Sequence, residues 1–295
     1  EAEQQLQTAH KKLWAVREKR VRPGLDDKIL TSWNALTLQG LIDAYTALGR
    51  GKYLHLALDN ARFIKDNLMA DDHQLYRNYK AGKASINGFL DDYALLAKAY
   101  LSLYQATFDE EWLHTAQGIV EYVERHFADT SSQMFFYTSD LDDPLIARKL
   151  EISDNVIPAS NSVMAEVLWE LGHLLGNTDY LAQSAQMVAN VEEQIIQQPP
   201  FFGRWAKVLL QHTHPPFEVA IVGPKALDYR LEMGKTYAPD VLYLGSLERS
   251  DLPLLEGKYK AGTTRIFVCQ DKVCHRPVET VAEAWEEIQR LRVES

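Results

Sequence analysis

Charged, amide and aromatic side chains gather at three places in this sequence where a helix is predicted to begin. The three groups are Asp26-Asp27-Lys28 with Trp33-Asn34, Asp91-Asp92-Tyr93, and Asp154 with Ser160-Asn161. Paired carboxylates suit glycoside chemistry, because one carboxylic acid protonates a leaving oxygen while a second carboxylate activates water or attacks the sugar. Aromatic rings beside them can cover the apolar faces of a sugar. The three groups therefore predict a carbohydrate site.

The residue types divide this predicted site into acid–base groups and binding groups. The candidate catalytic carboxylates are Asp91 or Asp92 as one partner and Asp154 as the other, with Asp27 as a further candidate. The candidate substrate-binding residues are Asp26, Lys28, Trp33, Asn34, Arg77, Tyr93, Ser160 and Asn161, among which Arg77 comes from a long loop. We predict no metal and no cofactor, because neither a zinc-type ligand spacing nor a glycine-rich phosphate loop occurs.

The same side chains also have a structural explanation. Asp, Asn and Ser side chains at helix starts cap free N–H groups, and capping is the favoured role of Asp26, Ser160 and Asn161 taken singly. Trp33 is favoured as a core residue, and Lys28 is expected to pair with a neighbouring aspartate. Asp92 is open to both interpretations, since it lies in the first turn of an apolar helix where an unpaired charge is costly.

Two kinds of helix alternate along the first two thirds of the chain. Residues 31–48 and 89–106 are apolar on almost every face, so they are expected to be buried on all sides. Residues 52–69 and 111–127 carry apolar side chains on one face, in step with the helical period. The pattern indicates buried inner helices that alternate with outer helices.

The pair of inner and outer helices repeats. An aromatic residue followed by leucine opens each outer helix about 60 to 70 residues after the last, as Tyr53-Leu54, Trp112-Leu113 and Tyr180-Leu181. Such hairpins predict a double-layered α/α array, either a solenoid or a closed toroid, with an irregular helical bundle as the alternative. All inner helices of an α/α array run the same way, so their starts share one rim, and the three polar groups are expected to be neighbours there.

We therefore expect a mainly α protein, an (α/α) toroid of repeated hairpins, with a small α/β element near the C-terminus. Residues 1–212 would form the array, and residues 213–295 the α/β element, whose last helix would pack back on the array. The strands predicted there are 218–222, 241–244 and 265–268, and the helices are 225–233 and 280–292. Two long links of the array, 70–88 and 129–158, are expected to hold short β-hairpins.

Composition argues against several classes of function. A net charge of −10 without a Lys/Arg-rich stripe argues against nucleic-acid binding. The apolar runs fall far short of the roughly 18 residues that cross a membrane. The two cysteines, Cys269 and Cys274, are interpreted as reduced thiols, and a cytoplasmic location is expected.

Three spaced motifs make the chain resemble a known family. They are Arg22-Pro23 with Asp26-Asp27-Lys28 and Trp33-Asn34, then Leu90-Asp91-Asp92-Tyr93, then Asp154 with Pro158 and Ser160-Asn161-Ser162. In this order they resemble the C-terminal part of the spermatogenesis-associated protein 20 / YyaL-like family, over essentially the whole chain. The resemblance implies an α/α toroid similar to six-hairpin glycosidases and N-acylglucosamine 2-epimerases, preceded in full-length members by a thioredoxin-like domain. It implies no assigned activity.

The resemblance also indicates what this chain is expected to lack. The thioredoxin-like domain with its redox cysteines is absent from the sequence, and about three to four helical pairs are visible where a closed ring needs six. An open arc would leave apolar inner-helix surface uncovered. Self-association, or contact with the missing N-terminal portion, is therefore expected.

Two functions remain open at this point. One is carbohydrate binding or a glycosidase- or epimerase-like activity at the rim, although no histidine of the kind that epimerases use lies at an inner-helix start. The other is a non-catalytic scaffold that supports a separate thioredoxin-like domain or a partner. Carboxylates that face one pocket would favour the enzyme, whereas carboxylates held in ion pairs would favour the scaffold.

Overall fold

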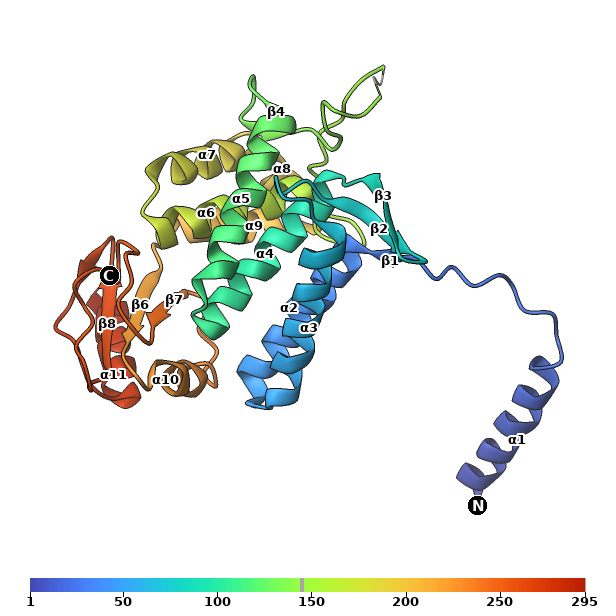
Figure 1. Ribbon diagram of the computed structural model, residues 1–295, viewed down its shortest axis with the longest axis horizontal. Helices are drawn as coiled ribbons and strands as arrows, with labels where there is room; N and C mark the ends of the chain where they lie inside the picture. Colours follow the sequence, from blue (N-terminus) through green and yellow to red (C-terminus); the bar gives the residue numbers. More distant parts are fainter. Residues whose placement is uncertain (144–145, 295) are drawn as a thin grey trace.

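The computed structural model describes residues 1–143 and 146–294 of the 295-residue chain (Figure 1). The helices are α1 (Ala2–Arg17), α2 (Thr31–Leu48), α3 (Gly51–Leu68), α4 (Leu90–Thr107), α5 (Glu110–His126), α6 (Ser160–Leu175), α7 (Thr178–Ala189), α8 (Glu192–Gln197), the 3-10 helix η1 (Pro199–Phe201), α9 (Gly203–Thr213), α10 (Ala226–Met233) and α11 (Val281–Glu294). The strands are β1 (Ile29–Leu30), β2 (Tyr76–Lys80), β3 (Lys83–Asn87), β4 (Ala128–Asp129), β5 (Met134–Phe135), β6 (Phe217–Val222), β7 (Val241–Ser246), β8 (Arg265–Gln270) and β9 (Val273–Cys274).

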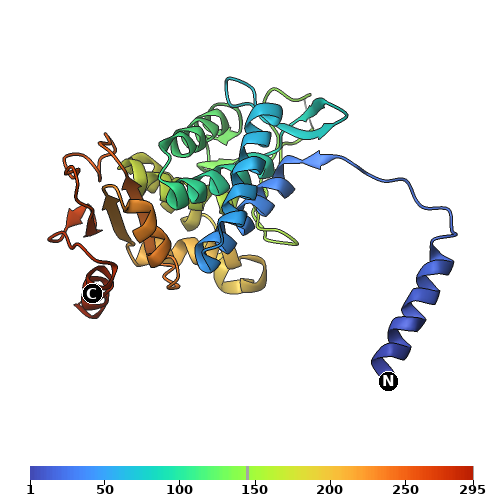
Figure 2. The same ribbon diagram turned by 60° about the horizontal axis from the view of Figure 1, so that its bottom comes forward.

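Three helical hairpins, α2/α3, α4/α5 and α6/α7, form a double layer (Figures 1 and 2). In the inner layer α4 packs between α2 and α6, and each inner helix packs on its own outer partner. Helix α9 extends the arc by packing against α6 and α7. The prediction of a mainly α, toroid-type array of hairpins is therefore confirmed.

Burial of the inner helices follows their place in the arc. Helices α4 and α6 are buried on nearly every side, as their continuous apolar character predicts. Helix α2 buries one side, and Trp33 on it is 55% exposed. The expectation that α2 is buried all round is wrong, because in the described part of the chain α2 has an inner neighbour, α4, on one flank alone.

The long links between hairpins carry short strands, as predicted. In the first link, β1, β2 and β3 form an antiparallel sheet in which Tyr79 pairs with Ile29 of β1 and with Ala84 of β3. Strand β1 leads directly into α2, and β3 ends shortly before α4, so this sheet fixes the starts of both helices. The second link holds the β4/β5 pair and a bridge between Phe136 and Leu150.

The chain after α9 forms the α/β element. Its strand order is β7-β6-β8-β9, with β6 and β7 parallel and β6 and β8 antiparallel, and α10 connects the parallel pair. The strands and helices predicted here are present. Helix α11 differs from the expectation that it packs back on the array, because its buried side chains Ala284 and Ile288 join the separate core of this sheet.

Phe108 connects the array to the α/β element. Helices α2 and α6 end at Gly49 and Gly176, which have positive φ angles of 65° and 68°, whereas α4 ends at Phe108 with φ 55°. A non-glycine residue adopts this conformation at a cost of roughly 1 kcal/mol. The ring of Phe108 packs closely on Gly245 of β7, where an added Cβ would lie 2.2 Å from it. Burial of this ring in the second core offsets the cost.

Cys269 and Cys274 form a disulfide, so their interpretation as reduced thiols is wrong. The two residues stand directly opposite each other in the β8/β9 ladder. A turn at Asp271 and Lys272, both with positive φ, reverses the chain between them. The pairing depends on strand register, which the spacing of two cysteines does not reveal.

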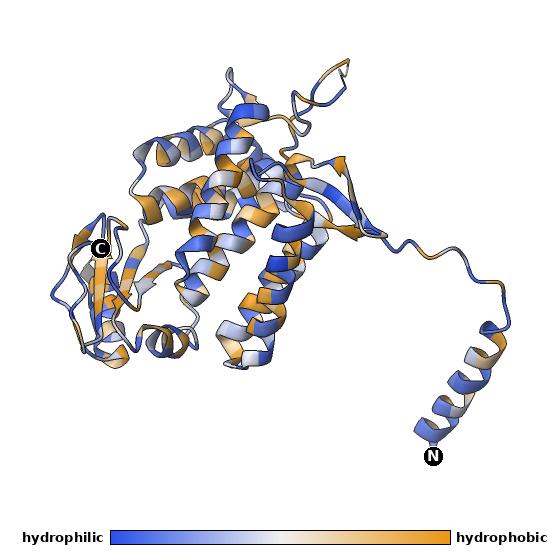
Figure 3. Ribbon diagram, in the orientation of Figure 1, coloured by the Kyte–Doolittle hydropathy of each residue, from blue (hydrophilic) through white to orange (hydrophobic). Residues whose placement is uncertain are grey.

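Helix α1 extends away from the array (Figure 1) and has no buried residue. Its ribbon is mostly hydrophilic with a few hydrophobic segments (Figure 3), and the apolar residues Leu6, Leu13 and Trp14 are exposed. Residues 1–212 were expected to form the array, but α1 does not join it. Within the two described ranges, no helix has both the length and the apolar character that a bilayer crossing requires.

Candidate functional site

Asp92 ties together the starts of the inner helices α2 and α4. Its Oδ1 accepts a hydrogen bond from the backbone N–H of Ser32 at 2.9 Å, and its Oδ2 accepts one from the backbone N–H of Phe89 at 3.0 Å. The side chain has no exposed surface. The carboxylate thus satisfies N–H groups that the two helix starts leave free, and α2 and α4 do meet at the predicted rim.

Arg77 bridges the two carboxylates of Asp91 and Asp92. Its Nη1 donates to Asp91 Oδ1 at 3.1 Å and to Asp92 Oδ2 at 3.0 Å. The hydroxyl of Tyr137 donates to Asp91 Oδ1 at 3.2 Å. Burial, reinforced by the charge of Asp91 and opposed by that of Arg77, raises the pKa of Asp92 to about 7. The pair is a buried, fully partnered network.

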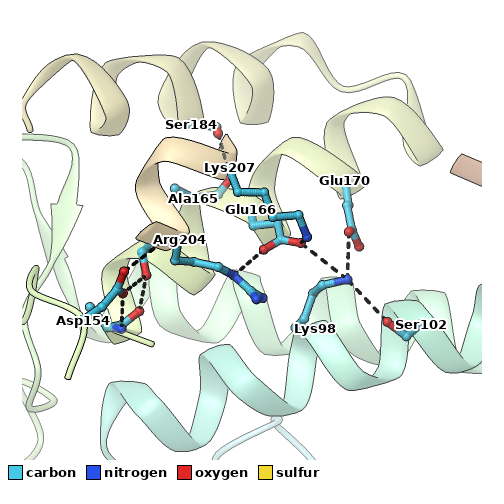
Figure 4. Close-up of polar contacts among 11 residues, drawn as sticks. Lys98, Ser102, Asp154, Ala165, Glu166, Glu170, Ser184, Arg204 and Lys207 are labelled. Carbon is cyan, nitrogen blue, oxygen red and sulfur yellow. Dashed lines mark hydrogen bonds and ion pairs between the residues drawn. The ribbon is translucent and has the colours of Figure 1, made fainter. Parts of the chain in front are cut away.

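Asp154 organises the starts of α6 and α9. Its Oδ1 accepts from the backbone N–H of Ala159 at 2.9 Å and from the Ser162 hydroxyl at 3.1 Å. Its Oδ2 accepts from the backbone N–H of Arg204 at 2.8 Å (Figure 4). Both oxygens are therefore engaged in structural hydrogen bonds, which favours a capping role over an acid–base role.

Asp154→Ala is expected to lower the free energy of unfolding by about 2–3 kcal/mol, because two backbone N–H groups and one hydroxyl lose their acceptor. Asp154→Asn retains an acceptor oxygen and should lose less. Urea unfolding followed by circular dichroism measures both, with the exposed Asp71→Ala as the matched control. Equal losses for Asp154→Ala and the control would refute the capping role.

Ser160 and Asn161 form hydrogen bonds with the second link, residues 129–158, and do not face a pocket. Asn161 Nδ2 donates to the backbone oxygen of Phe135 at 2.8 Å, and its Oδ1 accepts from the N–H of the same residue at 2.9 Å. The backbone N–H of Ser160 donates to the Glu151 carboxylate at 3.0 Å. Both residues are buried, and their contacts fix the chain that precedes α6.

The first polar group forms local contacts at the surface. Asp26 pairs with Lys28 at 3.2 Å, and Asp27 pairs with Lys80. A side-chain hydrogen bond from the lysine lowers the pKa of each aspartate. Asn34 Nδ2 donates to the backbone oxygen of Leu30, at the end of β1, at 2.9 Å. The expected pairing of Lys28 is present, but neither aspartate joins the buried network of Asp92.

The two aromatic residues predicted as sugar platforms have different surroundings. Tyr93 is a core residue: its ring stacks on Tyr122 with centroids 5.3 Å apart, and its hydroxyl accepts from the backbone N–H of Leu75 at 2.9 Å. Trp33 is exposed on α2, so its favoured interpretation as a core residue is wrong. Of the predicted site residues, the structure thus brings together Arg77, Asp91 and Asp92 at the rim. The others lie in caps, in the core or on the surface.

Sequence reasoning missed a set of five charged residues between α4, α6 and α9 (Figure 4). This set, the inner charge cluster, consists of Lys98, Glu166, Glu170, Arg204 and Lys207. Lys98 Nζ lies 2.8 Å from Glu170 Oε1 and 3.7 Å from Glu166 Oε1. Lys207 Nζ lies 2.8 Å from Glu166 Oε1, and Arg204 pairs with Glu166 Oε2.

The ion pairs of the inner charge cluster favour the charged forms of Glu166 and Lys98. Burial alone would raise the pKa of Glu166, but three surrounding cations lower it to about 2. Burial likewise opposes the charge of Lys98, yet the two glutamates raise its pKa. One signal in the sequence could have revealed the set: Lys98 is the single charged residue of the otherwise apolar and neutral stretch 93–107.

A cavity of about 360 Å³ opens beside this cluster. This inner cavity is lined by Gln39, Asp43, Lys98, Ser102, Gln105, Glu170, Arg204, Lys207, Gln211, Pro239, Val241 and Leu242. Three buried acceptor atoms of its lining receive no hydrogen bond from the described residues, namely Gln39 Oε1, Glu170 Oε2 and Gln211 Oε1. Across residues 1–143 and 146–294, no group of three or more His, Cys, Asp or Glu side chains could hold a metal ion.

Known proteins resemble this chain over nearly its whole length. Spermatogenesis-associated protein 20 of Rattus norvegicus is 25% identical over 299 residues, which cover 94% of this chain and 38% of that protein. The Homo sapiens protein of the same name is 23% identical with the same coverage. An uncharacterised Caenorhabditis elegans protein is 26% identical and covers 92% of this chain and 39% of its own length. The chain therefore spans about two fifths of these relatives, and no family model matches it.

Solved structures with a similar arrangement include three proteins. A sugar epimerase from a ruminal bacterium has a TM-score of 0.49 at 16% identity, covering 70% of this chain and 59% of that chain. A D-mannose isomerase has a TM-score of 0.49 at 13% identity, with 72% and 65% covered. A GH76 α-mannanase of Bacteroides thetaiotaomicron has a TM-score of 0.48 at 19% identity, with 58% and 47% covered. The resemblance predicted from three motifs is confirmed: the chain is a toroid-type α/α array similar, over 94% of its length, to proteins named spermatogenesis-associated protein 20.

Proposed function

We propose that this chain binds a carbohydrate in the inner cavity. The observation that supports the proposal is the set of three buried acceptors in the cavity lining that lack a donor: Gln39 Oε1, Glu170 Oε2 and Gln211 Oε1. A buried acceptor without a donor costs about 1–3 kcal/mol. Several hydroxyl groups on one small molecule are suited to satisfy three such atoms together.

The rest of the lining suits the same ligand. Ammonium and guanidinium groups of the inner charge cluster and the hydroxyl of Ser102 supply donors, so the lining offers both donors and acceptors. Its volume falls within the range of about 300–1,000 Å³ that is typical of small-molecule sites. Glu166, with its pKa lowered to about 2, anchors the cations and is unsuited to donate a proton.

The proposal is binding, and it places the ligand in the cavity instead of at the rim. A glycosidase needs two available carboxyl groups about 5–10 Å apart. The rim carboxylates are engaged instead: Asp92 holds two helix starts, Asp154 caps α6, and Asp26 pairs with Lys28. The same pairings favour a scaffold as the second candidate, in which the rim only stabilises the array.

Binding is tested with the double variant Gln39→Leu/Gln211→Leu, which removes two of the three acceptors without touching the inner charge cluster. Saturation-transfer NMR against a panel of neutral mono- and disaccharides is the measurement. We expect the affinity of any sugar that binds to fall at least about tenfold, because the sugar hydroxyls lose their acceptors.

Gln186→Leu on the outer helix α7 is the matched control, since this glutamine is exposed and is not one of the residues that line the cavity. It should bind like the unmodified chain. Failure of the unmodified chain to bind any sugar of the panel, or unchanged affinity in the double variant, would reject the proposal and leave the scaffold.

A further inference from the structure

A second cavity, of about 430 Å³, lies where α10 and β7 meet the C-terminal halves of α2 and α4. Its lining includes Asp43, Thr46, Gln105, Arg230, Tyr237 and Tyr243. It shares Asp43 and Gln105 with the inner cavity, so the two are adjacent. Its principal feature is the arginine, which comes from the α/β element and not from the array.

Arg230 is buried, with 8% of its surface exposed, and is held in a fixed orientation. Its Nε donates to the backbone oxygen of Gln105 at 2.6 Å, and its guanidinium lies 3.9 Å above the centre of the Tyr243 ring. The cation–π contact with the Tyr243 ring and the hydrogen bond to the Gln105 carbonyl together orient the guanidinium. Both partners are neutral, so neither balances the positive charge.

The guanidinium of Arg230 has donors left over. Its Nη1 is buried and has no hydrogen-bond acceptor among the described residues. Among the described residues, no carboxylate forms an ion pair with Arg230. Burial lowers the pKa of this arginine, because it disfavours the charged guanidinium. A buried cation without a counter-charge is costly, and a guanidinium fork matches the oxygen atoms of a phosphate or a carboxylate.

We propose that this cavity binds a small ligand through an oxyanion, a phosphate or a carboxylate group, placed against the guanidinium of Arg230. The oxyanion supplies the missing counter-charge and accepts from the free donors. Hydroxyl groups that line the cavity, among them that of Thr46, are further donors. Asp43 is the carboxylate among the described lining residues, and it disfavours an anion by repulsion. This proposal rests on a different group, the guanidinium of Arg230, from the three acceptors that support the sugar site, although the two cavities share part of their lining.

The test compares inorganic phosphate and acetate with chloride at constant ionic strength, using thermal unfolding and isothermal titration of the unmodified chain. Phosphate, acetate or both should raise the melting temperature above that in chloride, and the active anion identifies the group. In Arg230→Met, which keeps the length and the apolar contact with Tyr243, affinity should fall at least about tenfold. Arg249→Met, which replaces an exposed arginine, should bind like the unmodified chain.

Asp43→Asn gives a second measurement that does not depend on the folding of Arg230→Met. Loss of its negative charge should strengthen anion binding severalfold, because this exposed aspartate lines the same cavity. The proposal is overturned by three results: no effect of either anion beyond chloride, full affinity in a folded Arg230→Met variant, or unchanged affinity in Asp43→Asn. Sugar binding in the inner cavity can persist in all three cases, so the two proposals fail separately.

Discussion

Glu166→Ala is expected to lower the free energy of unfolding by about 3–5 kcal/mol, because it removes the centre of a buried ion network. The side chain of this glutamate has no exposed surface, and three cations pair with it, namely Lys98, Arg204 and Lys207. Without its carboxylate, those cations face one another with Glu170 as their remaining counter-charge. Urea unfolding at pH 7 measures the loss.

The pH dependence of this loss is also set by Glu166. Its pKa is lowered to about 2 from an ordinary 4.5, so its contribution to stability is fully present above pH 4.5 and is lost as the pH falls through 2. The difference between the unmodified chain and Glu166→Ala should therefore narrow in acid. Glu286→Ala, at an exposed position of α11, should change stability by less than about 0.5 kcal/mol. A Glu166→Ala variant as stable as this control would show that the cluster contributes nothing.

Asp92→Ala is the other substitution with a large expected effect, about 3–4 kcal/mol at pH 5. It leaves the backbone N–H groups of Ser32 and Phe89 without an acceptor, and it removes one partner of Arg77. Asp92→Asn keeps an acceptor oxygen and a neutral side chain, so we expect a smaller loss. Urea unfolding of both variants between pH 4 and 8 measures the effect.

The direction of the pH dependence is opposite to that of Glu166. The pKa of Asp92 is raised to about 7 from 3.8, so its contribution is fully present below pH 3.8 and is lost as the pH rises through 7. The difference between the unmodified chain and Asp92→Ala should shrink from pH 4 to 8, while Asp92→Asn should show no such trend. Asp59→Ala, on the exposed side of α3, is the control. A difference that grows with pH would contradict the raised pKa.

The periodicity of apolar residues predicted most of the helices and strands. Residues 31–48 form α2 with the predicted bounds, and the strands of the α/β element begin and end within two residues of their predicted limits. Periodicity records how apolar a helix is, but not which neighbours cover it, so the exposure of α2 was not predictable. The cysteine pair and the packing of α11 depend on strand register and on a second core, which are tertiary properties.

The candidate site was predictable in part. The rim prediction brought Arg77 and Asp92 together correctly, because helix direction alone places inner-helix starts at one end. It did not show that backbone N–H groups already occupy those carboxylates. The inner charge cluster was missed because its ion pairs join residues far apart in the sequence, as Lys98 and Glu170 are. Lys98 was nevertheless detectable as a lone charge in an apolar helix.

The spacing of the inner charge cluster limits how the sequence of this array can vary in length. Lys98 and Ser102, Glu166 and Glu170, and Arg204 and Lys207 are each separated by about one helical turn, on three different helices. One inserted residue turns the rest of a helix by about 100°, which would direct these side chains away from their partners. An inserted or deleted residue within α4, α6 or α9 is therefore expected to break up the cluster, which fixes the number of residues between its members on each of these helices.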